Sequence, residues 1–175
     1  MKFHKTILQD AYLIELEDFN DERGTFSRQF CKKEFLSNGI DIDICQCNIS
    51  KNYKANTLRG LHFQKAPFLE SKIVSCFKGA FFDVIVDLRQ SSPTYLKWEA
   101  FELTEQNNYM LYIPPEFAHG FQTLVDDTVV FYQLGNYFEP AFYDGLRWDD
   151  PKLGINWPDC PARIISEKDK SYKLL

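Results

Sequence analysis

A series of short β-prone runs, separated by turn residues, fills the chain between residues 43 and 138. Such spacing is typical of a β-sandwich or a β-barrel. The expected strands cover 44–50, 57–63, 71–77, 80–88, 97–104, 109–113, 119–125 and 128–138. The aromatic content, 16 Phe and 9 Tyr among 175 residues, agrees with this interpretation because aromatic side chains favour strands. The sequence therefore predicts an all-β fold.

The flanks of this region add few further elements. Two more strands are expected at 11–17 and 25–30, and one short helix at 32–38. The segment after Pro140 is polar and rich in turn residues, which predicts a lid or cap. Because no repeat or linker divides the sequence, residues 1–175 are interpreted as a single domain.

Charge and composition exclude several classes of protein. The net charge of −5 argues against a nucleic-acid partner, so an anionic ligand has to bind in a local basic pocket. No apolar run approaches the roughly 20 residues of a membrane span, and we expect a soluble cytoplasmic protein. The five cysteines form no C-x-x-C pair, which predicts free thiols.

The first candidate functional residue is His62, one of only three histidines. It belongs to the predicted strand Leu58-Arg-Gly-Leu-His-Phe-Gln64. Strict alternation places His62 on the same face as Gly60 and Gln64, and Arg59 on the opposite face. A lone histidine in a strand is more often structural than catalytic, so its neighbours have to decide its role.

A second histidine, His119, raises the possibility of a metal site. The pattern Pro114-x-Glu116-x-x-His119 matches a metal-site element of cupin barrels, except that Glu116 replaces a glycine. A metal-dependent oxygenase or hydrolase would use four ligands: His62, Gln64, Glu70 and His119. The amide of Gln64 is a weak ligand, and the ammonium of nearby Lys72 would repel a divalent cation. We therefore favour a metal-free site.

Lys72 and Asp83 are charged residues in strands that are otherwise apolar. Lys72 shares one strand face with two apolar residues, so it is expected to point inward. A buried lysine needs an anionic partner, which here is either Asp83 or a negatively charged ligand. Asp83 lies in the apolar run 80–87 and also needs a partner. Tyr132 lies in another strand, where packing alone explains a tyrosine.

Six motifs, taken in order, resemble those of the dTDP-4-dehydrorhamnose 3,5-epimerase family over about residues 5 to 170. They are Asp21-Glu-Arg-Gly24, Leu58-Arg-Gly-Leu-His-Phe-Gln64, Asp83-Val-Ile-Val-Asp-Leu-Arg89, Ser92-Pro-Thr94, Phe117-Ala-His-Gly-Phe121 and Arg147-Trp-Asp-Asp-Pro151. The resemblance implies a cupin-like jelly-roll β-sandwich with a few short helices. It also implies a homodimer that exchanges an N-terminal strand, a nucleotide-linked 4-keto-6-deoxy sugar as substrate, and no metal or organic cofactor.

The resemblance also assigns catalytic roles. It implies that His62 removes the proton from a carbon next to the C4 ketone, and that Tyr132 returns one on the opposite face of the ring. Asp169, in Ser166-Glu-Lys-Asp169, matches the carboxylate that orients the histidine. Lys72 is our candidate for stabilising the enolate oxygen, and His119 is a candidate to share that task.

The remaining expected contacts concern the nucleotide end of the ligand. The positions that match the family's ligand contacts are Arg23, Gln46, Asn48, Arg59 and Lys168. Tyr137 is a candidate to stack on the base. Since alternation turns Arg59 away from His62, Arg59 reaches the ligand only at a barrel mouth, across a bulge or in a partner subunit.

Three residues differ from the family pattern and leave the sugar nucleotide open. Arg28 replaces a glutamate, Tyr143 an acidic residue, and Glu116 a glycine. The favoured function is inversion of C3, C5 or both in deoxysugar biosynthesis for cell-surface polysaccharide. One alternative is a single-centre epimerase acting on a CDP- or GDP-linked sugar or a heptose. Another is a non-catalytic module that binds sugar nucleotides.

Overall fold

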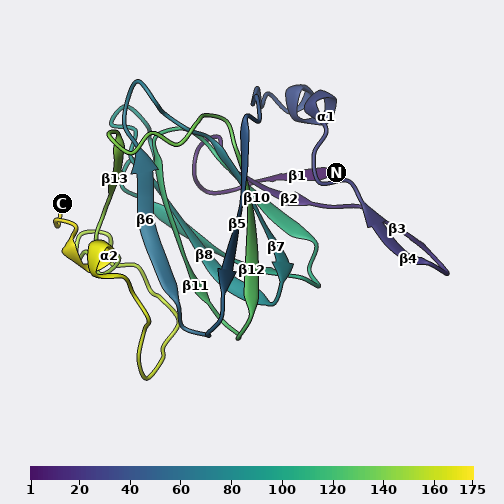
Figure 1. Cartoon of the computed structure of the whole chain (residues 1–175). Helices are drawn as coiled ribbons and strands as arrows, with labels where there is room; N and C mark the ends of the chain where they lie inside the picture. Colours follow the sequence, from purple (N-terminus) through teal and green to yellow (C-terminus); the bar gives the residue numbers. More distant parts are fainter.

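Two antiparallel β-sheets pack face to face in the computed structural model, which describes residues 1–175 (Figure 1). The six-stranded sheet has the order β1-β2-β10-β7-β12-β5, and the five-stranded sheet has the order β13-β6-β11-β8-β9. The strands are β1 (Lys2–Lys5), β2 (Tyr12–Glu15), β3 (Asp18–Asp21), β4 (Gly24–Ser27), β5 (Gln46–Asn52), β6 (Leu58–Gln64), β7 (Lys72–Lys78), β8 (Ala80–Asp87), β9 (Trp98–Thr104), β10 (Tyr109–Ile113), β11 (Phe117–Thr123), β12 (Thr128–Leu134) and β13 (Tyr143–Gly145). The predicted all-β, cupin-like fold is confirmed.

All eight strands expected in the middle of the chain are present; 109–113 has the expected ends, and the ends of the other seven are shifted. The expected strand 128–138 ends at Leu134, and the expected helix 32–38 is α1 (Lys32–Ser37). The sequence did not indicate β1 or the short helix α2 (Glu167–Ser171). Neither helix has the length and apolar character needed to cross a membrane.

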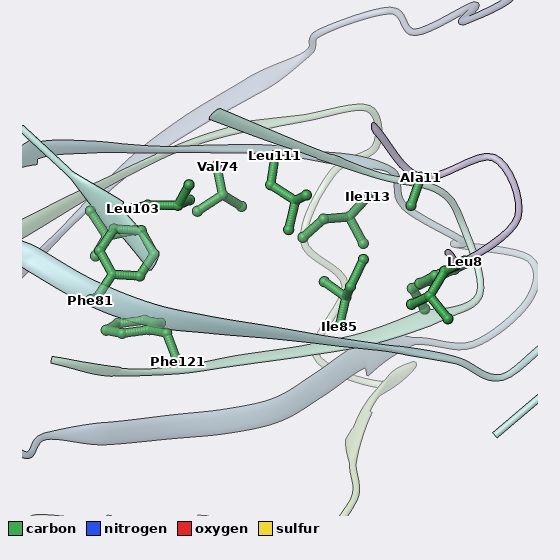
Figure 2. Close-up of a cluster of buried hydrophobic side chains, with 11 residues drawn as sticks. Leu8, Ala11, Val74, Phe81, Ile85, Leu103, Leu111, Ile113 and Phe121 are labelled. Carbon is green, nitrogen blue, oxygen red and sulfur yellow. The ribbon is translucent and has the colours of Figure 1, made fainter. Parts of the chain in front are cut away.

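The main core lies between the two sheets. Val74 and Leu111 from the six-stranded sheet face Ile85 and Phe121 from the five-stranded sheet (Figure 2). These side chains come from alternate positions of their strands, as the period of two requires. Asp83 lies between Phe81 and Ile85 on the same face of β8, so its carboxyl group points into the sandwich.

The segment after Pro140 covers the outer face of the five-stranded sheet. Leu146, Leu153 and Trp157 pack there against Val84 and Val86 of β8. The expected cap is therefore present, but most of it covers a sheet face. Within this segment, β13 and α2 contribute side chains to the space between the sheets.

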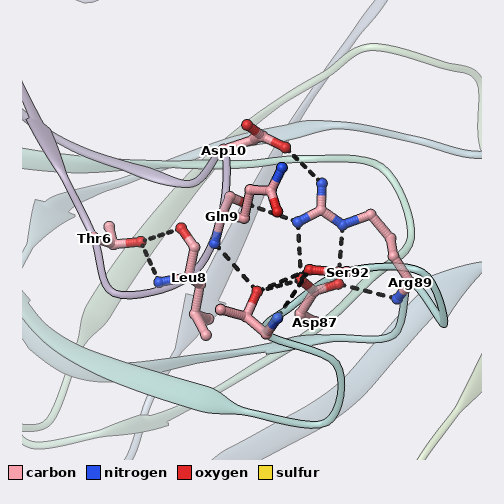
Figure 3. A network of polar contacts seen from close by, with 8 residues as sticks. Thr6, Leu8, Gln9, Asp10, Asp87, Arg89 and Ser92 are labelled. Atoms are coloured by element: carbon pink, nitrogen blue, oxygen red, sulfur yellow. Dashed lines mark hydrogen bonds and ion pairs between the residues drawn. The ribbon is translucent and has the colours of Figure 1, made fainter.

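A polar network ties the N-terminal loop to the connection between β8 and β9 (Figure 3). Arg89 lies in that connection and donates through Nε and Nη2 to Asp87 at the end of β8. Its Nη1 donates to Asp10, and Nη2 also donates to the carbonyl of Gln9. Burial raises the pKa of Asp87, but hydrogen bonds from Arg89, Ser92 and Thr94 outweigh it and lower the pKa to about 2. This network holds the start of the chain against the sandwich.

The hairpin of β3 and β4 is separate from both sheets and projects from the body of the molecule (Figure 1). It carries two large apolar side chains, Phe19 and Phe26, that are 64% and 69% exposed. The expected strands 11–17 and 25–30 are thus shorter than predicted and belong to different units, since β2 lies in the six-stranded sheet and β4 in the hairpin.

Candidate active site

A β-bulge in β6 decides which side chains of this strand share a face. His62 lies opposite His119 of β11 and Arg59 lies opposite Phe121, so Gly60 and Leu61 together face only one residue. The extra residue shifts the alternation by one position. The prediction that Arg59 points away from His62 is therefore wrong, and of the three routes considered for Arg59 the structure uses the bulge.

Glycine is required at the bulge. Gly60 has a φ of +128°, and a Cβ atom there would lie only 2.4 Å from the Cα of Gly120. The two strands approach too closely for any side chain, and a non-glycine residue rarely adopts this φ. The pair Gly60 and Gly120 thus allows the bulge that brings Arg59 and His62 together.

A cavity of about 460 Å³ opens between the two sheets. Its size is within the usual range for small-molecule sites. One wall comes from the five-stranded sheet and includes Arg59, His62, His119, Phe121 and Tyr143. The other wall comes from the six-stranded sheet and includes Asn48, Lys72, Tyr132 and Leu134. Lys168 of α2 also lines the cavity.

His62 and Asp169 form a buried pair behind the first wall. The Nε2 atom of His62 lies 2.8 Å from Oδ1 of Asp169, and the backbone N–H of Gly60 donates to Oδ2 at 3.2 Å. Ser166 caps the helix that carries Asp169 by accepting from its backbone N–H. Burial raises the pKa of Asp169, but the hydrogen bonds from His62 and Gly60 outweigh burial and lower the pKa. Asp169 is therefore a carboxylate.

The imidazole of His62 is neutral near pH 7. Burial lowers its pKa below the ordinary value of 6.5, and the opposing effect of Asp169 is smaller. The nearby Lys72 and His119 add to the decrease. Because Nε2 faces the carboxylate and donates to it, Nδ1 carries the lone pair. His62 can thus accept a proton at Nδ1.

Tyr132 stands on the opposite wall, on β12. Its hydroxyl makes no hydrogen bond with the protein, and its ring lies 6.1 Å from that of His119, edge to face. Burial raises the pKa of Tyr132, and the carboxyl of Asp83 adds to the increase. The group is therefore a protonated phenol that faces the cavity.

Lys72 points into the cavity, as predicted, but its partner within the chain is not Asp83. Its Nζ atom lies 3.0 Å from Oε1 of Glu70, and both side chains are less than 10% exposed. Residues two apart in an extended chain share a face, which makes Glu70 the nearest acid to Lys72. The ammonium also donates to the carbonyl of His62 at 3.4 Å. The expected pairing of Lys72 with Asp83 is therefore corrected, since the ion pair is made with Glu70.

The partner of Asp83 is His119. Its Nε2 atom lies 2.5 Å from Oδ1 of Asp83, which is fully buried. The adjacent strands β11 and β8 set this contact, since Phe121 pairs with Asp83 in the ladder and His119 is two residues away on the same face. Burial raises the pKa of Asp83. The cavity therefore contains two histidines, each bound to its own carboxyl group.

The structure brings only some of the expected ligand contacts to the cavity. Asn48, Arg59 and Lys168 line it, whereas three others do not. Gln46 lies beside it and accepts from the backbone N–H of Phe138 at 3.2 Å. Tyr137 is 65% exposed, and its neighbour Phe138 lines the cavity instead.

Arg23 also lies outside the cavity of its own chain. It sits at the tip of the β3–β4 hairpin, its side chain is 84% exposed, and it pairs with Asp21. The hairpin projects from the body of the molecule, so Arg23 has no route to the cavity of this chain (Figure 1).

The sequence analysis did not predict that Tyr143 belongs to this site. It noted Tyr143 only as a residue that replaces an acidic residue of the family pattern. It lies on β13, which pairs with β6 so that Tyr143 is opposite Gln64 and Gly145 is opposite His62. Its ring centroid is 5.2 Å from that of His62. A strand of only three residues in a turn-rich segment gives no periodic signal that could have placed it.

The four residues of the metal interpretation do not form a metal site. The amide nitrogen of Gln64 donates to the carbonyl of Phe68 and to Glu70, and its oxygen accepts from the backbone of Glu139 at 2.6 Å. Gln64 is thus turned away from the cavity lining. No group of three or more His, Cys, Asp or Glu side chains has an arrangement that could hold a metal ion.

Comparisons with known proteins agree on one family. The family model for dTDP-4-dehydrorhamnose 3,5-epimerase matches residues 5–175. A protein of that name from Sinorhizobium fredii is 44% identical over 175 residues, which cover 100% of this chain and 90% of the relative.

Two solved structures are also similar to this chain; the first is named dTDP-4-dehydrorhamnose 3,5-epimerase and the second dTDP-6-deoxy-D-glucose-3,5-epimerase. A crystal structure from Bacillus anthracis with TDP and PPi bound has a TM-score of 0.96 and 40% identity, with 99% of both chains covered. One from Legionella pneumophila, in complex with dTDP-4-keto-L-rhamnose, has a TM-score of 0.94 and 34% identity, with 99% of this chain and 92% of the other covered.

Proposed function

Because the chain belongs to the dTDP-4-dehydrorhamnose 3,5-epimerase family, we propose that its cavity inverts C3 and C5 of a dTDP-linked 4-keto-6-deoxyhexose. The chain is an isomerase, an epimerase of dTDP-rhamnose deoxysugar biosynthesis. The observation that carries the residue assignment is the placement of His62 and Tyr132 on opposite walls of one cavity. The expected cytoplasmic location is part of the proposal.

The reaction starts with the removal of a proton next to the C4 ketone. The Nδ1 lone pair of His62 takes the proton, the C–H electrons form a C=C bond, and the former carbonyl oxygen becomes an enolate. Asp169 stabilises the imidazolium that forms. Lys72 stabilises the enolate oxygen, and one preorganised donor of this kind lowers a barrier by about 3–4 kcal/mol.

Inversion follows when a proton returns from the other side. The enolate electrons re-form the ketone, and the carbon takes a proton from the hydroxyl of Tyr132 on the opposite wall. The new C–H bond then points to the face opposite the lost one. The step leaves a phenolate at Tyr132 and an imidazolium at His62, and proton exchange with solvent restores both groups before the second carbon reacts.

Two unpaired cations support a diphosphate at the mouth of the cavity. Lys168 makes no ion pair, and Arg59 uses only Nε, which donates to Asn52 at 2.8 Å. The remaining guanidinium N–H groups are free for phosphate oxygens, which arginine binds in a bidentate manner. Asn48 and His119 lie within the same lining and are proposed substrate contacts. Gln46 and Tyr137, beside the cavity, are proposed contacts of the nucleotide.

We also propose that two copies of the chain form a homodimer by exchanging their N-terminal segments. Two features support it. The projecting hairpin exposes Phe19 and Phe26, and the outer face of the six-stranded sheet exposes Ile49 and Phe77, with Phe77 stacked on Phe131. Exposed apolar side chains on this scale indicate a surface that a partner protein covers. In such a dimer the hairpin of one protomer carries Arg23 to the cavity of its partner.

Proton NMR in deuterated water tests the proposed function directly. Incubation with dTDP-4-keto-6-deoxyglucose should replace hydrogen by deuterium at both C3 and C5, because each epimerised carbon exchanges its proton. Exchange at one carbon only would identify a single-centre epimerase, and CDP- and GDP-linked analogues in parallel would identify a different nucleotide preference. Absence of exchange with every substrate would reject the assignment and leave a module that only binds sugar nucleotides.

A further inference from the structure

The cavity contains a second phenol that the reaction described above does not use. Tyr132 projects from the six-stranded wall, and Tyr143 projects from the five-stranded wall, beside the base. The hydroxyl of Tyr143, like that of Tyr132, makes no hydrogen bond with the protein. A tyrosine that lines a polar cavity without a hydrogen-bond partner has its hydroxyl free for a ligand.

Contacts on three sides fix the ring of Tyr143. It packs against His62 at 5.2 Å between centroids and against the edge of Phe138 at 5.2 Å. The Nζ atom of Lys168 lies 4.4 Å from its ring centroid, which is a cation–π contact. On the backbone side, β13 is hydrogen-bonded to β6, the strand of His62. The hydroxyl of Tyr143 is therefore held in a defined position relative to the base.

The chemistry of this hydroxyl suits a sugar. Burial raises the pKa of Tyr143, so the group is a neutral phenol that both donates and accepts hydrogen bonds. The hydroxyl groups of a hexose also do both. A carboxylate at this position would only accept, and it would pair with Lys168, whose charge is otherwise free for the diphosphate.

We propose that Tyr143 is a specificity-determining residue whose hydroxyl binds a hydroxyl group of the sugar on the His62 side of the ring and so sets which carbon next to the ketone lies over His62. The inference rests on the proposed function. The two carbons flank the ketone, and a small rotation of the ring exchanges their distances from a fixed base. A hydrogen bond on the side of the base acts directly on that rotation.

The same residue shields the base from water. The charged and titratable groups around His62 are Asp169 on α2, Lys72 on β7, His119 on β11, Tyr143 on β13, and Tyr172 beyond α2. The Tyr143 ring covers one side of the imidazole. Replacing tyrosine by phenylalanine keeps this ring and removes only the hydroxyl, so the substitution isolates the proposed contact with the sugar.

The experiment compares Tyr143→Phe with Tyr172→Phe as a matched control. Tyr172 also packs against His62, at 6.1 Å, but it does not line the cavity and its hydroxyl is buried without a partner. Deuterium exchange gives the ratio of the C3 and C5 rates. Calorimetry gives the affinities for dTDP-glucose, which has no C4 ketone, and for dTDP alone, and thermal melts check that both variants fold.

We expect Tyr143→Phe to change the ratio of the C3 and C5 exchange rates at least threefold. It should also lower the affinity for dTDP-glucose at least fivefold and leave the affinity for dTDP unchanged. Tyr172→Phe should leave all three values within twofold of the wild type. A rate ratio that changes less than threefold in Tyr143→Phe would overturn the proposal. So would an equal loss of affinity for dTDP and dTDP-glucose, since the contact would then be with the nucleotide.

Failure of the proposed function gives a different result. If the wild-type protein exchanged neither carbon, the epimerase assignment would fail, and the two affinities alone would decide the role of Tyr143. If Tyr143→Phe lost affinity for dTDP-glucose but not for dTDP, the contact with the sugar would still be supported. If the variant and the wild type bound dTDP-glucose with equal affinity, the contact would be excluded.

Discussion

His62 and Asp169 are 107 residues apart in the chain, and their side chains meet at 2.8 Å behind the wall of the cavity. The contact joins strand β6 of the five-stranded sheet to the short helix α2. It fixes the imidazole so that one nitrogen is occupied and the other is free. Because the two residues are far apart in the sequence, the pair forms only when the sandwich is complete and the C-terminal segment packs on it.

The first prediction concerns the charge of Asp169. Asp169→Asn should lower kcat/KM by at least about 100-fold, because a neutral amide does not stabilise the imidazolium. Asp169 raises the pKa of His62, so its replacement should lower that pKa further and move the acid limb of the pH profile to lower pH. Rates measured as a function of pH test both effects.

The control for this variant is Asp144→Asn, which removes a carboxylate of β13 that pairs with Lys65 and does not line the cavity. It should leave kcat/KM within about twofold of the wild type. An Asp169→Asn enzyme with nearly full activity and an unchanged profile would show that His62 does not depend on this carboxylate.

The second prediction is the pH dependence of the wild-type enzyme. His62 has to be neutral to accept a proton, and its pKa is below 6.5 because of burial. We expect kcat/KM to be constant from pH 7 down to 6.5 and to fall tenfold per pH unit only below the lowered pKa. An acid limb centred above pH 6.5 would contradict the burial of the base.

The same pKa decrease predicts how His62 affects stability. Between its folded pKa and 6.5, the unfolded chain binds a proton that the folded chain does not, so the free energy of unfolding decreases as the pH falls through this range. Urea titrations at a series of pH values should show this decrease in the wild type, and His62→Gln should lack this contribution.

The regular parts of the site could be predicted from the sequence. Lys72 lies in a strand that keeps a period of two on its inward face, so alternation placed its side chain correctly. Tyr132 was identified only through the family resemblance. Arg59 could not be placed in this way, because the bulge depends on how β6 pairs with Gly120 in another strand. Glu70 was missed as the partner of Lys72 because it precedes the strand.

Contacts made by the end of the chain were beyond pattern reasoning. The strand β13 and the helix α2 are too short for a periodic signal, yet they carry Tyr143 and Lys168 to the cavity and Asp169 to His62 behind its wall. Asp169 was identified only through the family resemblance. The physical reason is that short elements form where tertiary packing holds them, and the intrinsic preference of their residues adds little.

The fourth prediction tests the glycine of the bulge. Gly60→Ala should lower the free energy of unfolding by at least about 3 kcal/mol, because strain at a positive φ adds to a clash with Gly120. Gly24→Ala is the matched control, since its φ of +126° is nearly the same and no atom lies within 4 Å of a new Cβ. The control should lose only the contribution of the strained φ, about 1 kcal/mol of the free energy of unfolding. Equal losses in urea unfolding would show that the close approach is unimportant.

The last prediction tests the exchange of N-terminal segments through complementation. His62→Ala and Arg23→Ala should each be nearly inactive as pure proteins, the first without its base and the second with weaker phosphate binding. If Arg23 serves the partner's cavity, a dimer of one copy of each variant contains one cavity with both His62 and Arg23 intact. Co-expression with two affinity tags isolates this mixed dimer, and we expect about half of the wild-type activity. If Arg23 serves its own cavity, neither cavity of the mixed dimer is complete, and its activity would stay at the level of the pure variants. A monomer in light scattering would exclude the exchange altogether.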